Sequence, residues 1–325
     1  MFQKLPARLC HSGGWFHRTF TGCFCCFPKS LLINVFFCIF PLMMNRQRKY
    51  PLHGWLGLLL VAVFWFLNWY LEGLRTHLAF FPLWLGYILA VDGFVFMRKG
   101  TSPVSRSKTG FILLFVFSIP FWWLFELFNT VLQNWHYTGR EYFSDIAYAL
   151  YASLNFSTVL PAVFVTAELV ATFRLQTLNK PRWNTGRNLP LVFFISGWIM
   201  LFLFLAWPRI FFPLVWVSVY FIIEPVNYRL GFTNLLQHTE KGNWRPVWNL
   251  WIGVLACGFF WELWNYYSWP KWTYDLPYLN EPKLFEMPIA GYLGYLPFSS
   301  ELFALYNLLT GVFRIKSLKN YVHPE

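Results

Sequence analysis

The sequence predicts an all-α integral membrane protein of about eight transmembrane helices, arranged as two tandem four-helix repeats in parallel orientation. Three observations predict this fold class: an apolar composition, long apolar stretches, and motifs that occur twice in the same order. Of the 325 residues, 57% are hydrophobic and 12% are charged, whereas a soluble domain typically carries about twice that charged fraction. The composition therefore excludes an ordinary soluble domain.

Eight apolar stretches are long enough, or nearly long enough, to cross about 30 Å of hydrocarbon as helices. A spanning segment finds no water for its backbone groups, so it must be a helix or part of a closed barrel. Continuous apolar runs without strict alternation indicate helices. We expect spans at 55–73, 80–97, 110–130, 157–173, 189–206, 211–228, 247–267 and 298–314.

The connection before the last span is expected to break the helical pattern. Between residues 276 and 299 the sequence contains four prolines and two glycines. Proline removes a backbone donor and glycine weakens a helix, so one continuous helix is excluded there. We expect a broken or re-entrant segment on the outer side, which membrane proteins tolerate where it is buried in protein or lines a cavity.

Motifs recur in the same order in the two halves of the chain. Phe80-Phe81-Pro82-Leu83 returns as Phe211-Phe212-Pro213-Leu214. The matched residues that follow are Asp92 and Glu224, Arg98 and Arg229, Gly100 and Gly231, Glu126 and Glu262, Asn129 and Asn265, Trp135 and Trp272, Tyr137 and Tyr274, and Asp145 and Glu286. We expect repeat 1 at 45–180, repeat 2 at 181–318 and a tail at 319–325. Four spans per repeat give both repeats the same orientation, related by an axis along the membrane normal.

The distribution of lysine and arginine predicts the orientation in the membrane. If residues 45–53 are cytoplasmic, all but five of the lysines and arginines after residue 44 lie in cytoplasmic connections. The five on the other side are Arg75, Arg140, Arg209, Lys271 and Lys283. By the positive-inside rule, we expect a multi-pass protein of the cell (inner) membrane, with the start of the core and the C-terminus in the cytoplasm.

Residues 1–44 do not belong to the repeated pattern. They contain five of the six cysteines, and an apolar run at 31–44 ends in Met43 and Met44. We expect an extension that precedes the core and is not part of it. A signal-like or short anchoring segment is an alternative. A metal site is not expected, because these cysteines lack the paired C-x₂-C spacing of zinc sites.

Carboxylates inside the predicted spans are the candidates for chemistry. A charged carboxylate at the centre of a membrane helix costs about 2.5–3.5 kcal/mol on insertion scales, so such residues face the protein interior and are candidates for function. Glu126 and Asn129 stand three residues apart on one helical face, as do Glu262 and Asn265. We expect the two pairs to meet at a common site as catalytic residues, with glutamates that hold and donate a proton.

Aromatic residues surround these candidates in the sequence. We expect a substrate-binding set of Trp122, Trp123, Trp135, Tyr137, Trp261, Trp264, Trp272 and Tyr274, with Glu286. Aromatic faces stabilise a developing cation by about 0.5–2 kcal/mol each. Protonated acids among aromatic rings suit acid-initiated carbocation chemistry on an isoprenoid chain. Two simpler interpretations stay open: the rings form an interfacial aromatic belt, and the Glu/Asn pairs only join helices by hydrogen bonds.

The other polar residues of the spans have simpler expectations. Asp92 and Glu224 lie close in sequence to Arg98 and Arg229 and are expected to form charge pairs with them. The motif Arg75-Thr76-His77 is compatible either with an interfacial position or with binding of a phosphate or lipid headgroup.

A family resemblance follows from the order of these motifs. An apolar helix ends in an acid (Glu126, then Glu262), Trp-x-Tyr follows in an outer loop, and an acid and a proline precede the next helix (Glu286-Met287-Pro288). This arrangement resembles the lycopene cyclase domain and carotenoid hydratase families. The resemblance implies an integral membrane enzyme whose carboxylates perform acid chemistry on polyene ends. This sequence lacks the adjacent Pro-x-Glu-Glu of that cyclase family and has four spans per repeat instead of three.

The expected partner is a membrane lipid or another lipophilic small molecule. No cofactor is expected, because the sequence has no Walker loop, no G-x-G-x-x-G and no H-E-x-x-H motif. The basic residues are spread through short loops and not gathered on one face, so no nucleic-acid partner is expected either. A transporter or channel with a proton-linked polar site between the repeats is the alternative function, and a non-catalytic membrane scaffold is a third. The oligomeric state is left open.

Overall fold

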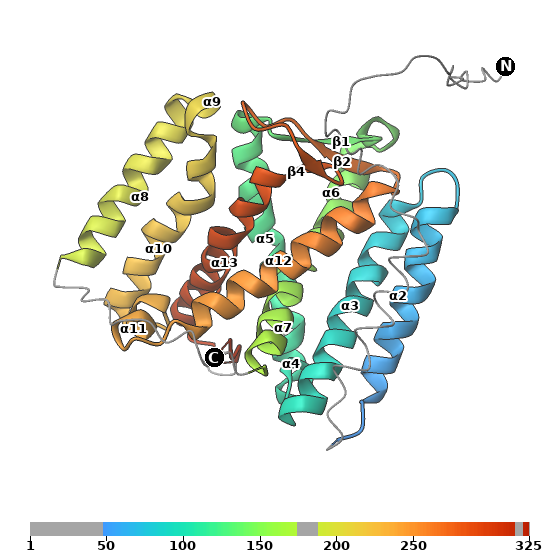
Figure 1. Ribbon diagram of the computed structural model, residues 1–325, viewed down its shortest axis with the longest axis horizontal. Coiled ribbons are helices and arrows are strands. Elements are labelled where there is room, and N and C mark those ends of the chain that lie inside the picture. The colour runs from blue at the N-terminus through green and yellow to red at the C-terminus, as the bar shows by residue number, and fades with distance from the viewer. Residues whose placement is uncertain (1–47, 174–187, 316–320, 325) are drawn as a thin grey trace, which may run out of the picture. The chain divides into compact units, whose positions relative to one another are not determined.

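The computed structural model describes residues 48–173, 188–315 and 321–324. Contacts divide the chain into residues 1–42 and 43–325, and all described elements belong to the second unit (Figure 1). The predicted extension at residues 1–44 lies outside the described residues. We call residues 48–173 the first half and residues 188–315 the second half.

Seven helical segments of the described residues are long and apolar enough to cross a membrane. They are α2 (Leu52–Tyr70), α3 (Thr76–Lys99), α5 (Lys108–Leu132), α6 with α7 (Asp145–Phe156, Val159–Ala171), α8 (Leu189–Ala206), α9 with η3 and α10 (Pro208–Phe211, Phe212–Leu214, Val215–Leu230), and α12 (Arg245–Tyr266). The chain is therefore a multi-pass helical membrane protein, as predicted.

The eighth predicted span is a helix of a different character. It is α13 (Tyr292–Val312), and it is not among the seven segments apolar enough to span a membrane. Its buried residues include Ser299, Ser300 and Glu301, which lower its hydropathy. Seven of the about eight expected spans are therefore apolar helices, and α13 is a more polar helix at the position of the eighth.

Two element boundaries differ from the predicted ones. The fourth span begins at Asp145 and not at 157, because Ser144 accepts a hydrogen bond from the Ala147 backbone at 3.3 Å and caps α6. The last helix begins at Tyr292 and continues through Pro297. The segment before it is irregular, as predicted: it contains β3 (Lys283–Leu284), β4 (Met287–Pro288) and η4 (Ile289–Gly291).

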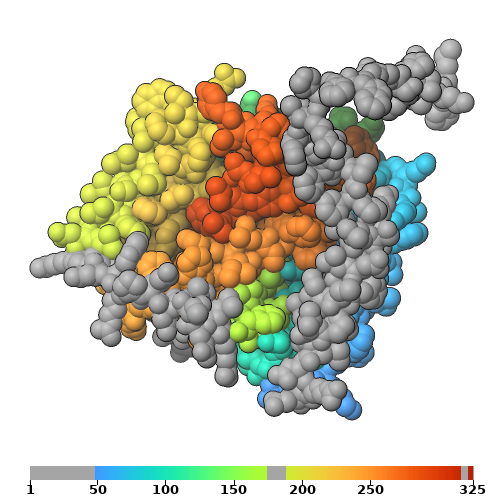
Figure 2. All heavy atoms as spheres, in the orientation of Figure 1, coloured from blue at the N-terminus to red at the C-terminus, as the bar shows by residue number. Residues whose placement is uncertain are grey.

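The faces of the helices that turn away from the protein are apolar. Exposed large hydrophobic side chains on α2 and α8 include Leu59, Phe66, Trp198, Ile199 and Phe202. In water such a surface would be unfavourable, whereas against lipid tails it carries no penalty. Figure 2 shows atoms of α12 and α13 (orange to red) at the surface of one face, next to those of α8 and α10 (yellow).

The two halves of the sequence pack directly against one another. Helix α12 of the second half contacts α7 and α2 of the first half, and α13 contacts α5. Two short strands also join the halves: β1 (Trp135–Thr138), after α5, pairs antiparallel with β2 (Lys271–Tyr274), after α12. In this register Trp135 faces Tyr274 and Tyr137 faces Trp272. The all-α prediction therefore needs one addition, a two-stranded ribbon that links the halves.

The opposite end of the helices carries two short helices, α4 (Pro103–Arg106) and α11 (Leu235–Glu240) (Figure 1). Ser102 and Asn234 cap them by accepting from the backbone N–H three residues on. A buried acid adds a second acceptor in each case. Asp92 accepts from the Val104 backbone at 3.0 Å, and Glu224 accepts from the Leu236 backbone at 2.8 Å.

The expected charge pairs of these two acids are wrong. Asp92 meets His53 at 2.9 Å, while the Arg98 guanidinium donates to the Thr172 hydroxyl at 2.7 Å. Within the described ranges, neither Arg98 nor Arg229 forms an ion pair. The reason is geometric: the connection after each helix folds back, so that backbone N–H groups reach the carboxylate first.

Candidate functional site

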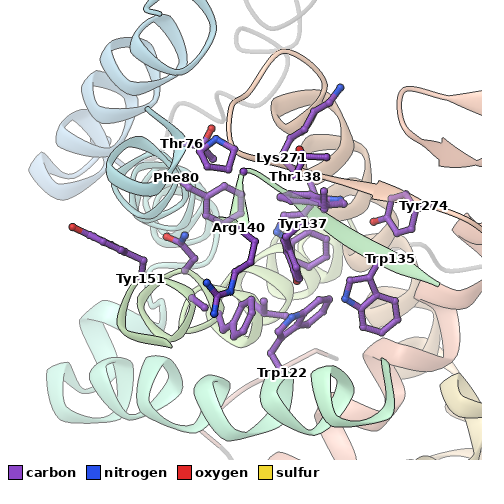
Figure 3. A pocket seen from close by; sticks show the side chains of 18 of the residues that line it. Thr76, Phe80, Trp122, Trp135, Tyr137, Thr138, Arg140, Tyr151, Lys271 and Tyr274 are labelled. Atoms are coloured by element: carbon purple, nitrogen blue, oxygen red, sulfur yellow. Dashed lines mark hydrogen bonds between the residues drawn. The ribbon is translucent and has the colours of Figure 1, made fainter. Parts of the chain in front are cut away.

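A cavity of about 180 Å³ lies beneath the ribbon and is lined from both halves of the sequence. Its walls are mainly aromatic, and Figure 3 shows several of these side chains around the space. The aromatic residues that line it are Phe80, Trp122, Trp135, Tyr137, Phe143, Tyr148, Tyr151, Phe156, Trp216, Trp261, Trp272, Tyr274 and Tyr295. Its mainly apolar, aromatic lining is typical of a small-molecule site.

Most residues predicted to bind substrate lie together at this cavity. The six that line it are Trp122, Trp135, Tyr137, Trp261, Trp272 and Tyr274. Trp123 does not line it, and its indole donates to the Ser153 hydroxyl at 3.0 Å. Trp264 is buried behind the wall against Trp84. Glu286 stands outside the lining and forms an ion pair with Lys271, which lines the cavity.

Glu126 lies behind the cavity wall and binds three of its residues. Its Oε1 accepts from the Tyr137 hydroxyl at 2.6 Å, from the Trp122 indole at 2.8 Å and from the Trp135 indole at 3.1 Å. The carboxyl group therefore orients three rings that face the cavity. It reaches the cavity only through these donors, because Glu126 itself is not among the lining residues.

Glu262 makes the corresponding contacts in the second half. Its Oε1 accepts from the Tyr274 hydroxyl at 2.8 Å, from the Tyr295 hydroxyl at 3.0 Å and from the Trp272 indole at 3.4 Å. Glu262 is fully buried. Its Oε2 has no hydrogen-bond partner among the described residues, so this oxygen is free to carry a proton.

The third donor comes from a different place in each half. Trp122 precedes Glu126 by one helical turn, and the matched position before Glu262 is Gly258. A Cβ on Gly258 would lie 2.6 Å from the Tyr295 ring. The absent side chain leaves the space that Tyr295 occupies, so the two halves reach three donors by different routes.

Asn129 and Asn265 hold the strands in place over the two glutamates. The Asn129 amide donates to the Trp135 carbonyl at 2.8 Å, and its oxygen accepts from the Asn134 backbone at 3.0 Å. The Asn265 amide donates to the Trp272 carbonyl at 2.7 Å and accepts from the Trp272 backbone at 3.0 Å. Neither asparagine lines the cavity. The contacts of both predicted catalytic amides are thus those of positioning residues.

The phenols of the ribbon keep their protons. Burial, together with the nearby Glu126 carboxyl group, raises the pKa of Tyr137 well above its ordinary value. Burial and Glu262 do the same to the pKa of Tyr274. Both hydroxyls therefore act as hydrogen-bond donors to the carboxyl groups, and a phenolate does not form at ordinary pH.

Sequence reasoning missed several residues of the site. Tyr295, Arg140 and Lys271 line the cavity but were not among the predicted site residues. Arg140 and Lys271 form ion pairs with Asp145 and Glu286 respectively. The sequence contained a signal for Arg140 and Lys271. Their acidic partners, Asp145 and Glu286, are matched between the halves, and both cations are among the few expected on the outer side.

The donor set of the described residues does not resemble a metal centre. No group of three or more histidine, cysteine, aspartate or glutamate residues comes close enough within the described ranges to hold a metal ion. Comparison with known proteins finds no matching family model, no matching curated protein and no matching solved structure.

Proposed function

We propose that this membrane protein binds a lipophilic substrate in the aromatic cavity and transfers a proton to it through two acid–phenol pairs, Glu126 with Tyr137 and Glu262 with Tyr274. One observation carries the proposal. Glu126 and Glu262 each accept a hydrogen bond from a phenol, and the rings of both phenols line the same cavity. General acids work at hydrogen-bond distance from the group that they protonate, or through one intervening donor.

The proposed step is a proton relay. The tyrosine hydroxyl gives its proton to a carbon–carbon double bond of the substrate, while the protonated glutamate returns a proton to the tyrosine oxygen. The substrate becomes a carbocation and the glutamate becomes a carboxylate, so charge and atoms balance. After ring closure, loss of a proton from a neighbouring carbon completes a cyclisation, whereas addition of water and loss of one of its protons completes a hydration. In both cases the released proton returns through the tyrosine to the glutamate carboxylate, which restores the starting acid.

The aromatic wall suits such a cation. Trp122, Trp261 and Trp272 present rings to the cavity, and each face stabilises a nearby cation by about 0.5–2 kcal/mol. The low water content of an apolar cavity also protects the cation from unwanted capture. An isoprenoid or another unsaturated lipid is the proposed substrate class, in agreement with the resemblance to lycopene cyclase domains and carotenoid hydratases.

We also propose that the two halves are tandem repeats. Three sets of contacts support this: Asp92 with Glu224 at the short helices, Glu126 with Glu262 at the ribbon, and Asn129 with Asn265 at the strands. The register of the ribbon also fits a twofold relationship. Exchanging the halves converts the pair Trp135 and Tyr274 into the pair Trp272 and Tyr137, which is the other pair in the register.

The proposed orientation places α4 and α11 in the cytoplasm and the ribbon on the outer side of the cell membrane. The short helices lie at the end of the bundle opposite the ribbon (Figure 1), and most lysines and arginines fall in the connections of that end. Positive residues are retained on the cytoplasmic side during insertion.

The test compares lipid extracts of cells that express the wild-type chain or variants. Glu126→Gln, Glu262→Gln and the double variant remove the proposed proton source but keep the size of the side chain. We expect the double variant to accumulate an unsaturated lipid that the wild type consumes, detected by mass spectrometry. Glu72→Gln, in the connection between α2 and α3, is the matched control and should leave the extract unchanged.

Two outcomes would count against this function. If the double variant and the wild type produce the same extract, the acids are not catalytic. If the extract changes equally in the Glu72→Gln control, the effect comes from expression and not from the site. Uptake of a polar solute that depends on Glu262 would favour the transporter alternative.

A further inference from the structure

Two basic residues line the mainly apolar cavity, and the acids that pair with them do not line it. Arg140 and Lys271 are the only charged residues among the described residues that line the cavity, and no aspartate or glutamate lines it. Figure 3 shows Arg140 extending from the end of β1 into the group of side chains, between Tyr151 and Trp122 in this view. The position is set by Gly139, whose backbone φ of +85° is readily adopted only by glycine.

The Arg140 guanidinium is held firmly but is not neutralised inside the cavity. One nitrogen donates to the Phe143 carbonyl at 2.8 Å, and the group lies 4.2 Å from the centre of the Tyr148 ring. Its ionic partner is Asp145, whose side chain is 97% exposed. A solvent-exposed ion pair contributes little and exchanges readily. An anion entering the cavity therefore meets a positioned guanidinium with a weakly bound counterion.

Two further polar atoms belong to residues that line the cavity and have no partner among the described residues. His77 Nδ1 and Asn155 Oδ1 are buried and form no hydrogen bond among the described residues, and both residues line the cavity. The His77 ring packs against Phe143 and Tyr151, at 5.2 Å and 4.9 Å between ring centres. Buried polar atoms normally have a partner. His77 and Asn155 therefore have unused hydrogen-bonding capacity beside the cavity.

The three residues of the motif Arg75-Thr76-His77 do not all have the same role at the cavity. Arg75 donates to the carbonyls of Asn68 and Tyr267, at 2.7 Å and 2.8 Å, and so is committed to holding loops. Thr76 and His77 line the cavity. The cation that lines this part of the cavity is therefore Arg140, which follows β1, and not Arg75.

We infer that the cavity binds an amphiphile with an anionic phosphate headgroup, with the phosphate at Arg140, His77 and Asn155 and the apolar chain against the tryptophans. The lining also fits such a chain, since it includes Trp216, Trp261 and the small residues Gly291 and Gly294. Arginine suits a phosphate because its planar group donates two parallel hydrogen bonds. This inference rests on the proposed function, since it names the class of its substrate.

The test measures binding to the purified full chain in lipid nanodiscs of uncharged and zwitterionic lipid. The probes are a prenyl monophosphate, the matching prenyl alcohol, phosphatidic acid and inorganic phosphate. We expect the wild type to prefer an anionic amphiphile to the alcohol, and Arg140→Gln to weaken that binding about tenfold or more. Binding of the alcohol should be unchanged, which also shows that the variant is folded.

Lys283→Gln is the matched control. Lys283 lies in β3 near the same end of the protein but does not line the cavity, so its loss should change neither affinity. Preference for the prenyl phosphate or for phosphatidic acid identifies the source of the headgroup, and either result supports the inference. The inference is overturned if the wild type binds the prenyl alcohol and the prenyl phosphate with equal affinity, or if Arg140→Gln weakens the binding of both equally. It is also overturned if inorganic phosphate displaces neither of the two anionic amphiphiles.

The binding measurement itself does not depend on proton transfer by the glutamates. Glu126→Gln should retain the preference for phosphate. If that variant also leaves cellular lipids unchanged while Arg140→Gln abolishes the preference, the cavity is a phosphate-lipid site and the proposed enzyme function is wrong. If the acids prove essential and Arg140 does not matter, the substrate is uncharged.

Discussion

Tyr295 lies directly over Gly258, in the space that a side chain at residue 258 would occupy. A Cβ there would approach the Tyr295 ring to 2.6 Å, and the Tyr295 hydroxyl donates to Glu262 at 3.0 Å. In the first half the corresponding residue is Trp122, which donates to Glu126 itself at 2.8 Å. The residue one turn before each glutamate therefore decides where the third hydrogen-bond donor comes from.

Gly258→Ala is expected to displace Tyr295 and to destabilise the protein by about 1–3 kcal/mol, the usual range for an overpacked core. Thermal unfolding of the purified protein in detergent measures the change. Gly294→Ala is the matched control, because its Cβ would meet the Trp216 ring at 3.2 Å, a milder contact. If both variants lower the unfolding temperature equally, the fit between Gly258 and Tyr295 has no special role.

The parts of this site that sequence reasoning identified are those with local signals. Glu126 and Glu262 follow apolar runs, and Trp-x-Tyr follows each of them, so their association needed no knowledge of the fold. Tyr295 and Arg140 reach the cavity only through tertiary packing. The amides of Asn129 and Asn265 share a helical face with the acids, but their binding to the strand backbone depends on where the chain turns.

The same distinction applies to the fold. Apolar length alone predicted the long helices α2, α3, α5, α7, α8, α10 and α12. Helix α6 was missed because Asp145 and Asn155 interrupt the apolar run. The ribbon was missed because β1 and β2 are each only four residues long and lie far apart in the sequence, and no local pattern predicts such a partner.

Asn265→Ala is expected to release β2 from α12. The variant leaves the Trp272 N–H and carbonyl without their partner, which costs about 1–3 kcal/mol for a buried group. Hydrogen exchange of the amides in Lys271–Tyr274 should accelerate, and Asn129→Ala should do the same for Trp135–Thr138. Asn280→Ala is the control, because Asn280 bonds the Asp275 side chain and the Leu276 N–H, both of which lie outside the two strands. Unchanged exchange in both strands would show that the asparagines are not positioning residues.

Alkaline pH should destabilise the protein through Tyr137 and Tyr274. Their folded-state pKa values lie well above the ordinary value, so the unfolded chain releases these protons first. The stability that they contribute is complete below about pH 10 and falls by about 1.4 kcal/mol per pH unit for each tyrosine above it. Unfolding midpoints measured between pH 9 and 11 should fall less steeply in Tyr137→Phe and Tyr274→Phe than in the wild type. Identical slopes would contradict the assignment.

Asp92 is expected to act mainly as a cap for α4 and only secondarily as the partner of His53. Its Oδ1 accepts from the Val104 N–H at 3.0 Å, and its Oδ2 meets His53 at 2.9 Å. Asp92→Ala leaves the Val104 N–H unsatisfied and should cost about 1–3 kcal/mol, whereas Asp92→Asn keeps an acceptor oxygen and should cost less.

Two comparisons separate capping from ion pairing. His53→Ala removes only the contact between the imidazole and the Asp92 carboxylate, so it should resemble Asp92→Asn in unfolding temperature and not Asp92→Ala. In the second half, Glu224 accepts from the Leu236 N–H, and none of the ion pairs of the described residues includes Glu224. Glu224→Ala should therefore be destabilising and Glu224→Gln nearly neutral. If His53→Ala is as damaging as Asp92→Ala, the ion pair is what stabilises this end of the first half, and the two acids do not have the same role.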